Sequence, residues 1–434
     1  MLGVGADGPL GPARSSDAPP GPIAGVERPP EAEPGLERRA AMLLMSVEGL
    51  GPVTFYRLLA ARGSARTILE LAASDAGRRE LLGHLGSVAE PGQDQARRPA
   101  QVVAGLATVA RDATAITDRL AALGLTWLSI DDRSYPARLR FVEVPPPVLF
   151  IRGPATALSA HKVVAIVGTR RATESGRRIA ARIANALARL GVVVVSGLAL
   201  GIDGAAHEAT VTAGGTTVAV LGSGHERLFP RAHARLADRI VETGGALVSE
   251  LPPDSFPTQG TFPRRNRVIS GLSDATIVVE AAARSGALIT AAWALEQGRA
   301  CFAVPGSIDA PASAGCLAFL HAYPDQVRIV AGIPDLIEDL HLSGQQTAPG
   351  TTGGPSSRAP QPAPAAVLAS LGPAERAVAG ALLAGSATVD DLARRTDLPV
   401  ATVLGTLTLL ELRALVTAAG GRYRLAGALL GAGE

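Results

Sequence analysis

The sequence places glycines and small polar residues directly after apolar runs, a pattern that suits anion binding. Gly168, Thr169 and Arg170 follow one run of β-branched residues, and Ser196 and Gly197 end the next. Glycine leaves backbone N–H groups open to a ligand, and a helix that begins beside them adds the positive end of its dipole. These two turns therefore predict a surface that binds phosphate groups.

Arginines cluster in two later segments. Arg231 follows a Phe-Pro pair, and Arg264, Arg265, Asn266 and Arg267 stand together at the start of a predicted helix. The planar guanidinium group donates hydrogen bonds in pairs, which matches the oxygens of a phosphate. Because this run follows a proline-rich loop between two strands, we favour a phosphate groove over a merely solvated helix face.

Asp203 and His207 are the other candidates in the second glycine-rich turn. Asp203 stands where a helix begins, a position at which a carboxylate caps the helix. His207 lies one turn further along and can be a buried, hydrogen-bonded histidine or a site residue. We favour a structural role for both.

The region from residue 162 onward alternates short apolar runs with helical periods, which is typical of βαβ units and a parallel sheet. The predicted fold is α/β: a Rossmann-like, doubly wound, mostly parallel sheet. The predicted strands lie at 163–167, 192–196, 217–221, 246–249, 275–279 and 301–304. The predicted helices lie at 175–190, 205–213, 232–243, 264–271 and 288–297.

The chain of 434 residues predicts several domains. Composition shifts give a disordered tail at 1–36, a helical domain at 37–124, the Rossmann-like domain with a leading extended connector at 125–342, a flexible linker at 343–365, a winged-helix domain at 366–427 and a tail at 428–434. In the first domain, the glycine-bracketed turn at 47–52 between two helices fits either a phosphate-binding helix-hairpin-helix or a simple packed hairpin. A further helix is expected at 102–123.

The C-terminal domain reads as three helices, at 373–383, 389–395 and 399–412, followed by a hairpin at 414–425. The third helix carries almost no basic residue before Arg413, and only Arg422 and Arg424 stand on the wing. Recognition of duplex DNA needs cations on that helix. A role in protein contacts is therefore as well supported as duplex binding.

Composition excludes several other classes. Cys301 and Cys316 are far apart and have no metal-ligand spacing, which fits a reduced cytoplasm. The turn at 168–170 is not GxGxxG, which argues against a dinucleotide cofactor. No Walker lysine or Ser/His/Asp set appears, and no apolar run reaches the ~20 residues of a membrane span. We expect a cytoplasmic protein with no cofactor, no metal, no catalytic residue and no membrane contact. With a net charge of +2, any nucleic-acid site must come from local clusters of cations.

Read in order, these motifs closely resemble the DNA-processing protein A (DprA/Smf) family. The resemblance rests on residues 167–170, 196–207, 214–222, 229–231, 249–250, 262–273, 280–290, 304–307 and 315–316. The helical region, resembling a sterile-alpha-motif-like domain, and the winged helix also match the family's architecture. One departure follows Cys316, where the family's asparagine and polar helix end are replaced by a largely apolar segment at 317–323.

The resemblance implies a non-enzymatic protein that binds and protects single-stranded DNA, forms a homodimer and loads the RecA recombinase during natural transformation. It implies that Arg170 and Arg231 are the principal phosphate contacts. The residues that would shape the groove around them are Gly168, Thr169, Ser196, Gly197, Arg264, Arg265, Asn266 and Arg267. With aromatics at only 3% of the chain, we expect salt-sensitive backbone binding and little base readout.

Two other functions stay open on the sequence. Glu280 near the sheet edge resembles the glutamate of phosphoribohydrolases, but the segment at 283–287 lacks the paired glycines of those enzymes. A transcription factor with a nucleotide-sensing Rossmann-like domain is the third reading, and its poorly basic third helix speaks against it.

Overall fold

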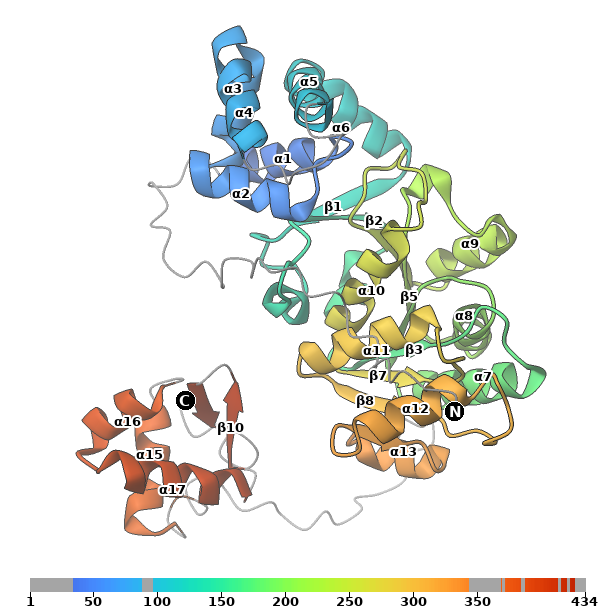
Figure 1. Ribbon diagram of the computed structural model, residues 1–434, viewed down its shortest axis with the longest axis vertical. Helices are drawn as coiled ribbons and strands as arrows, with labels where there is room; N and C mark the ends of the chain where they lie inside the picture. Colours follow the sequence, from blue (N-terminus) through green and yellow to red (C-terminus); the bar gives the residue numbers. More distant parts are fainter. Residues whose placement is uncertain are drawn as a thin grey trace, which may run out of the picture. The chain divides into compact units, whose positions relative to one another are not determined.

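The computed structural model describes residues 34–87, 97–342, 368, 371–383, 387–412, 415–419 and 422–425 (Figure 1). It divides into two compact units at residues 348 and 349. The predicted linker and C-terminal tail lie outside the described residues, as do residues 1–33 of the predicted N-terminal tail. The last residues of that tail are helical, because the first helix already begins at Pro34. No described helix has both the length and the hydropathy of a membrane span.

Six helices form an N-terminal bundle. They are α1 (Pro34–Met45), α2 (Pro52–Arg62), α3 (Ala65–Ala73), α4 (Asp75–Ser87), α5 (Arg97–Arg111) and α6 (Ala113–Ala122). The predicted single helix at 102–123 is wrong: the chain breaks at Asp112, a residue of low helix propensity, and continues as a second helix. The bundle core includes Met42 and Leu44 and extends onto Val148 and Phe150 of the sheet.

The sheet has nine strands in the order β1-β2-β6-β5-β4-β3-β7-β8-β9. In this order, all neighbouring strands from β6 through to β9 pair in parallel. The strand β2 pairs antiparallel with both of its neighbours, β1 and β6. The strands are β1 (Leu125–Ser129), β2 (Val148–Arg152), β3 (Val163–Val167), β4 (Val193–Ser196), β5 (Thr217–Val220), β6 (Ala246–Ser249), β7 (Ala275–Val278), β8 (Ala300–Ala303) and β9 (Val327–Ile329). The predicted Rossmann-like, doubly wound and mostly parallel sheet is confirmed.

The predicted extended connector before residue 162 is wrong in part. The chain forms β2, which pairs with β6 and adds an antiparallel edge to the sheet. The prolines at 145–147 precede this strand and leave its N–H groups intact, so they do not prevent pairing. The sequence also did not predict α12 (Ala314–Ala322), β9 or α13 (Ile333–Asp339).

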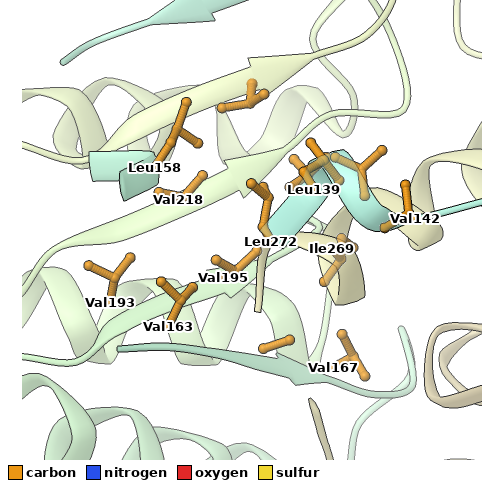
Figure 2. Packing of buried hydrophobic residues seen from close by; sticks show 14 of the residues in the cluster. Leu139, Val142, Leu158, Val163, Val167, Val193, Val195, Val218, Ile269 and Leu272 are labelled. Carbon is orange, nitrogen blue, oxygen red and sulfur yellow. The ribbon is translucent and has the colours of Figure 1, made fainter. Parts of the chain in front are cut away.

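Helices cover both faces of the sheet. The ones on one face are α7 (Glu174–Arg189), α8 (Ile202–Thr212), α9 (Ala234–Glu242) and α13; on the other lie α10 (Thr261–Leu272), α11 (Gly286–Glu296) and α12 (Figure 1). Side chains alternate along each strand. Val163 and Val167 of β3 therefore pack with Ile269 and Leu272 of α10 (Figure 2), whereas Ile166 packs with the α7 side.

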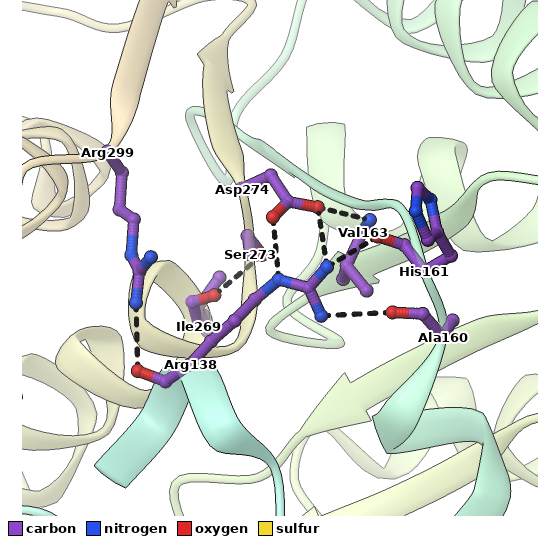
Figure 3. A network of polar contacts seen from close by, with 8 residues as sticks. All are labelled: Arg138, Ala160, His161, Val163, Ile269, Ser273, Asp274 and Arg299. Atoms are coloured by element: carbon purple, nitrogen blue, oxygen red, sulfur yellow. Dashed lines mark hydrogen bonds and ion pairs between the residues drawn. The ribbon is translucent and has the colours of Figure 1, made fainter. Parts of the chain in front are cut away.

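A polar network fixes the amino ends of β3 and β7. Arg138, in the turn η1 (Ala137–Phe141), pairs with Asp274 through Nε at 2.6 Å and Nη2 at 3.0 Å (Figure 3). The Val163 N–H donates to the same carboxylate at 2.9 Å. The paired guanidinium and carboxylate join the segment between β1 and β2 to the neighbouring strands β3 and β7. This network lies at the edge opposite to the predicted phosphate surface, which indicates a structural role.

The second unit is a small helical domain with a hairpin. It contains α15 (Pro373–Leu383), α16 (Val389–Thr396), α17 (Val400–Leu412), β10 (Val416–Ala419) and β11 (Arg422–Leu425). Thr388 and Asp391 form a capping box that starts α16. The predicted winged helix is confirmed. Arg413 and the side chains of Arg422 and Arg424 lie outside the described residues.

Candidate nucleic-acid interface

The point where the strand order reverses lies between β3 and β7. From β3 the chain winds through β4 and β5 to β6 on one side, and then returns to β7, β8 and β9 on the other. Val167 at the end of β3 faces Val278 of β7. The loops after these two strands therefore separate at the carboxyl edge of the sheet, which is where open α/β sheets bind their ligands.

A pocket of about 610 Å³ opens at this point. Its lining comes from the loop after β3, the loop after β4, the start of α10 and the loop after β7. The predicted residues among its lining are Gly168, Thr169, Arg170, Arg265 and Asn266, and they are joined by Arg171, Asp203, Gln259, Phe262, Arg284 and Gly286. The structure thus brings half of the predicted set to one pocket. Ser196, Gly197, Arg231, Arg264 and Arg267 do not line it.

Three exposed arginines border the pocket. Arg170 places its guanidinium 5.0 Å from the centre of the Phe262 ring. Arg171 and Arg284 are exposed, and among the described residues neither side chain has a hydrogen-bond or ion-pair partner. Both were missed by the sequence analysis. Arg171 directly follows the first glycine turn, and Arg284 precedes a Ser-Gly pair at a helix start, so the same glycine signal could have identified them.

Arg231 and Arg264 are also exposed. Arg231 comes two residues after Phe229, whose ring lies 5.7 Å from that of Phe262 at the pocket. Arg264 lies beside the N-terminal bundle, since its Nη2 is 3.9 Å from the position of a Cβ built on Gly51. In the chain, Arg264 stands between two lining residues, Pro263 and Arg265. Neither Arg231 nor Arg264 lines the pocket itself, and both are open to solvent.

Arg265 faces inward. Its Nη1 donates to the Gly197 carbonyl at 2.7 Å and also to the Val220 carbonyl. Burial lowers its pKa to about 10, and the nearby Asp203 opposes that shift. The guanidinium is bonded to the backbone beneath the pocket. Arg265 therefore shapes the pocket from below and does not present its charge to solvent.

Asp203 organises the turn above Arg265. Its Oδ2 accepts from the Gly197 N–H at 3.0 Å and from the Ala199 N–H at 3.4 Å. Burial raises the pKa of Asp203, and the charge of Arg265 opposes this rise. Ser196 is buried as well, where its hydroxyl donates to the Ile166 carbonyl at 2.6 Å. Ser196 and Gly197 thus hold the turn in place and do not face a ligand.

Arg267 is also buried and paired within the protein. Its Nη2 lies 2.5 Å from Glu250 Oε2, and both side chains are about nine-tenths buried. The neighbouring Asn266 donates from Nδ2 to the Gly286 carbonyl at 3.1 Å, which joins α10 to the start of α11. Of the three arginines at the start of α10, only Arg264 is exposed. The other two stabilise the frame because the helix turns them toward the sheet.

Glu280 occupies the N-terminus of α7. Its Oε2 accepts from the Thr173 N–H at 3.0 Å and from the Thr173 hydroxyl at 3.3 Å. Gly176 packs against this carboxylate so closely that a Cβ there would collide with it. The sequence predicts an anion site at this helix start, and the protein's own carboxylate fills it. Glu280 does not line the pocket.

His207 is fully buried and hydrogen-bonded. The Thr217 hydroxyl donates to the Val194 carbonyl at 2.7 Å, so its oxygen must accept from His207 Nδ1, at 2.8 Å. Burial lowers the pKa of His207 to about 3. The histidine is thus neutral and supports the core, in line with the structural role favoured from the sequence.

Comparison with known families identifies the chain. The model of the DNA recombination-mediator protein A family matches residues 126–341, and that of the DprA winged helix domain matches residues 359–422. The chain belongs to the DprA family. The first of these matches begins inside β1, so the matched region includes nearly all of the two antiparallel edge strands.

Curated DprA relatives support this assignment. The DNA processing protein DprA of Bacillus subtilis is 40% identical over 217 residues, which cover 50% of this chain and 72% of that protein. The putative DprA of Mycobacterium tuberculosis is 40% identical over 300 residues, which cover 69% and 73%. Protein Smf of Escherichia coli is 49% identical over 185 residues, which cover 43% of this chain and about half (49%) of that protein.

Two solved DprA structures are similar to the chain. DprA from Streptococcus pneumoniae superposes with a TM-score of 0.48 at 31% identity, covering 67% of this chain and 98% of that one. DprA from Helicobacter pylori, described with its single-stranded DNA binding mode, superposes with a TM-score of 0.46 at 27% identity, covering 50% and 96%.

The winged helix of this DprA protein has an apolar third helix. The sequence of α17 contains no lysine or arginine, and Val400, Leu404 and Leu409 are exposed on it. Helices that read duplex DNA need cations and polar side chains on that face. This observation weakens the reading of the chain as a duplex-reading transcription factor.

Proposed function

We propose that this protein binds the phosphate backbone of single-stranded DNA in the pocket at the carboxyl edge of β3 and β7. The observation that carries the proposal is the ring of exposed cations there: Arg170, Arg171 and Arg284 border the pocket, with Arg231 and Arg264 beside it. Gly168 and Gly286 also line the pocket, and because they have no side chains a ligand can approach the backbone there. Such a surface neutralises phosphates and leaves the bases largely unread.

A polymer fits this arrangement better than a bound nucleotide. In dinucleotide-binding sheets the phosphate lies on the N-terminus of a helix at the switch point. Here Glu280 already accepts hydrogen bonds at the start of α7, so a phosphate in that position meets a buried carboxylate. The free cations lie around the rim, where they meet successive phosphates of one chain.

Single-stranded DNA fits better than a duplex because the cations surround a recess. A flexible strand can bend its backbone into a pocket of this size, whereas a rigid duplex presents its phosphates on a convex surface. The role is one of binding and requires no catalytic residue. A phosphoribohydrolase activity is less well supported, because Glu280, its candidate catalytic residue, lies outside the pocket lining.

The proposal includes protection of incoming DNA, formation of a homodimer and loading of RecA in natural transformation. These three parts rest on the family resemblance and on the membership shown by the two family matches. They are tested by light scattering of the purified chain, by nuclease digestion of coated DNA, and by RecA strand exchange on single strands with and without this protein.

Fluorescence anisotropy with matched single-stranded and duplex oligonucleotides tests the central claim. We expect tighter binding of the single strand, similar affinity for oligonucleotides of different sequence, and a steep decrease of affinity with salt. A preference for the duplex, or no binding to either, would overturn the proposal.

A further inference from the structure

The outer face of α7 carries a row of arginines that the pocket does not use. Arg178, Arg182 and Arg189 are exposed and are separated by four and seven residues. At 3.6 residues per turn these positions lie within about 40° of one another around the helix. The buried side chains of α7, such as Ile183 and Leu187, lie on the opposite face. The row therefore forms a single stripe that points to solvent.

The charge of this stripe is mostly unneutralised. Glu174 is the only acidic residue in α7, and it pairs with Arg178 at 2.6 Å, where both side chains are exposed. Within the part of the chain that the structure describes, Arg182 and Arg189 have no ion pair or side-chain hydrogen bond. An ordinary solvated helix face mixes both signs, so that neighbouring side chains compensate one another. This face is cationic along its length.

The stripe begins next to the proposed DNA pocket. Arg171 lines the pocket, Thr173 caps α7 two residues later, and the helix then leads away from the carboxyl edge of the sheet (Figure 1). From Arg178 to Arg189 the helix rises about 16 Å, which is the length of roughly five stacked nucleotides of one strand. A strand that leaves the pocket past Arg171 thus meets a cationic surface of matching length.

We propose that α7 is a second, outer track for the same single strand, on which Arg182 and Arg189 bind phosphates downstream of the pocket. This inference rests on the proposed function and adds to it a footprint longer than the pocket. The occupant is a nucleic-acid strand because the stripe is cationic. An interface with a folded protein would need exposed apolar side chains, and none lies between these arginines.

The double variant R182A/R189A tests the track with two fluorescent oligonucleotides, one of about eight nucleotides that fills the pocket alone and one of about 40. We expect roughly tenfold weaker binding of the long strand and a salt slope smaller by about 1.4, from two lost phosphate contacts at about 0.7 each. Binding of the short strand is expected to stay unchanged.

The variant R79A/R133A is the matched control. Arg79 on α4 and Arg133 before η1 are exposed, and neither side chain has a partner among the described residues, so this pair removes the same charge from other elements. An equal loss with both double variants would mean that only net charge matters and would overturn the track. So would an unchanged long-strand affinity in R182A/R189A, or an equal loss on both lengths.

Failure of the track and failure of the pocket give different results. R170A removes a pocket cation and is expected to weaken binding of both oligonucleotides. If R170A has no effect while R182A/R189A weakens the long strand, the pocket proposal fails and α7 stands as the primary contact. Thermal melting followed by circular dichroism checks that the variants fold, and the exposed positions predict unchanged melting.

Discussion

The guanidinium of Arg265 donates a hydrogen bond of 2.7 Å to the carbonyl of Gly197, across 68 residues of sequence. This contact joins the start of α10 to the turn after β4, beneath the proposed DNA pocket. Asp203 accepts the N–H of the same glycine, so one turn is held from both its donor and its acceptor side. The buried charges of Arg265 and Asp203 thus fix the turn beneath the pocket, around which the exposed arginines lie.

Replacement of Arg265 by alanine should destabilise the fold. The substitution leaves the Gly197 and Val220 carbonyls without this donor and removes the cation that lowers the pKa of Asp203. Removal of one partner from a buried charged network typically costs about 3–5 kcal/mol. Urea denaturation should show a clearly lower midpoint for R265A. The exposed neighbour gives the control: R264A should keep the wild-type midpoint and lose DNA affinity, and a reversed pattern would contradict the assigned roles.

Replacement of Arg170 or Arg231 should weaken single-strand binding without unfolding the protein. Both side chains are exposed, and neither belongs to a hydrophobic core. Each lost phosphate contact should reduce the salt slope by about 0.7, and the loss should be similar for all base sequences. Anisotropy titrations at several salt concentrations measure both quantities. Losses confined to particular sequences would show that these residues read bases and would refute backbone binding.

Substitutions of Glu280 distinguish a structural role of this residue from a catalytic one. In E280Q the amide oxygen can still accept from Thr173, so we expect a decrease of stability of no more than about 1 kcal/mol, from loss of a negative charge at the start of α7. E280A removes the acceptor and should cost about 1–3 kcal/mol. Both variants should bind single-stranded DNA as the wild type does. Release of a base from a nucleoside monophosphate by the wild type, abolished in E280Q, would instead support the phosphoribohydrolase reading.

Stability should fall as the pH drops below about 6.5. Burial lowers the pKa of His207 to about 3 and that of His225 to about 4. Between these values and 6.5 the unfolded chain binds protons that the folded chain does not, so the free energy of unfolding rises with pH in this window. At pH 5 each histidine should reduce stability by about 2 kcal/mol relative to neutral pH.

The variant H207F checks the source of this dependence. It removes one titrating group, so the difference in urea midpoint between pH 7.5 and pH 5 should shrink whatever its effect on absolute stability. H225F should act in the same direction through a separate site. An unchanged pH dependence in both variants would show that these histidines are not the groups that titrate.

The sequence predicted the six parallel strands named in advance to within a residue or two, because each is a short run of Val, Ala and Ile between helical periods. It failed where that signal was weak. The strand β2 was read as a connector because the prolines before it masked its pairing with β6. The short strand β9 has exposed residues, including Ile329, and lacks a continuous apolar run.

The sequence by itself determined that glycines and arginines follow the parallel strands. Because βαβ units are right-handed, the turns after these strands must lie at one edge of the sheet. Only the tertiary structure decided which cations face solvent. Arg264, Arg265 and Arg267 are nearly adjacent in the chain, yet the turn of α10 directs Arg264 outward, Arg265 to the Gly197 carbonyl and Arg267 to Glu250. The buried acceptors that hold the latter two lie at or just after the carboxyl ends of β4, β5 and β6, which no local pattern brings to that helix.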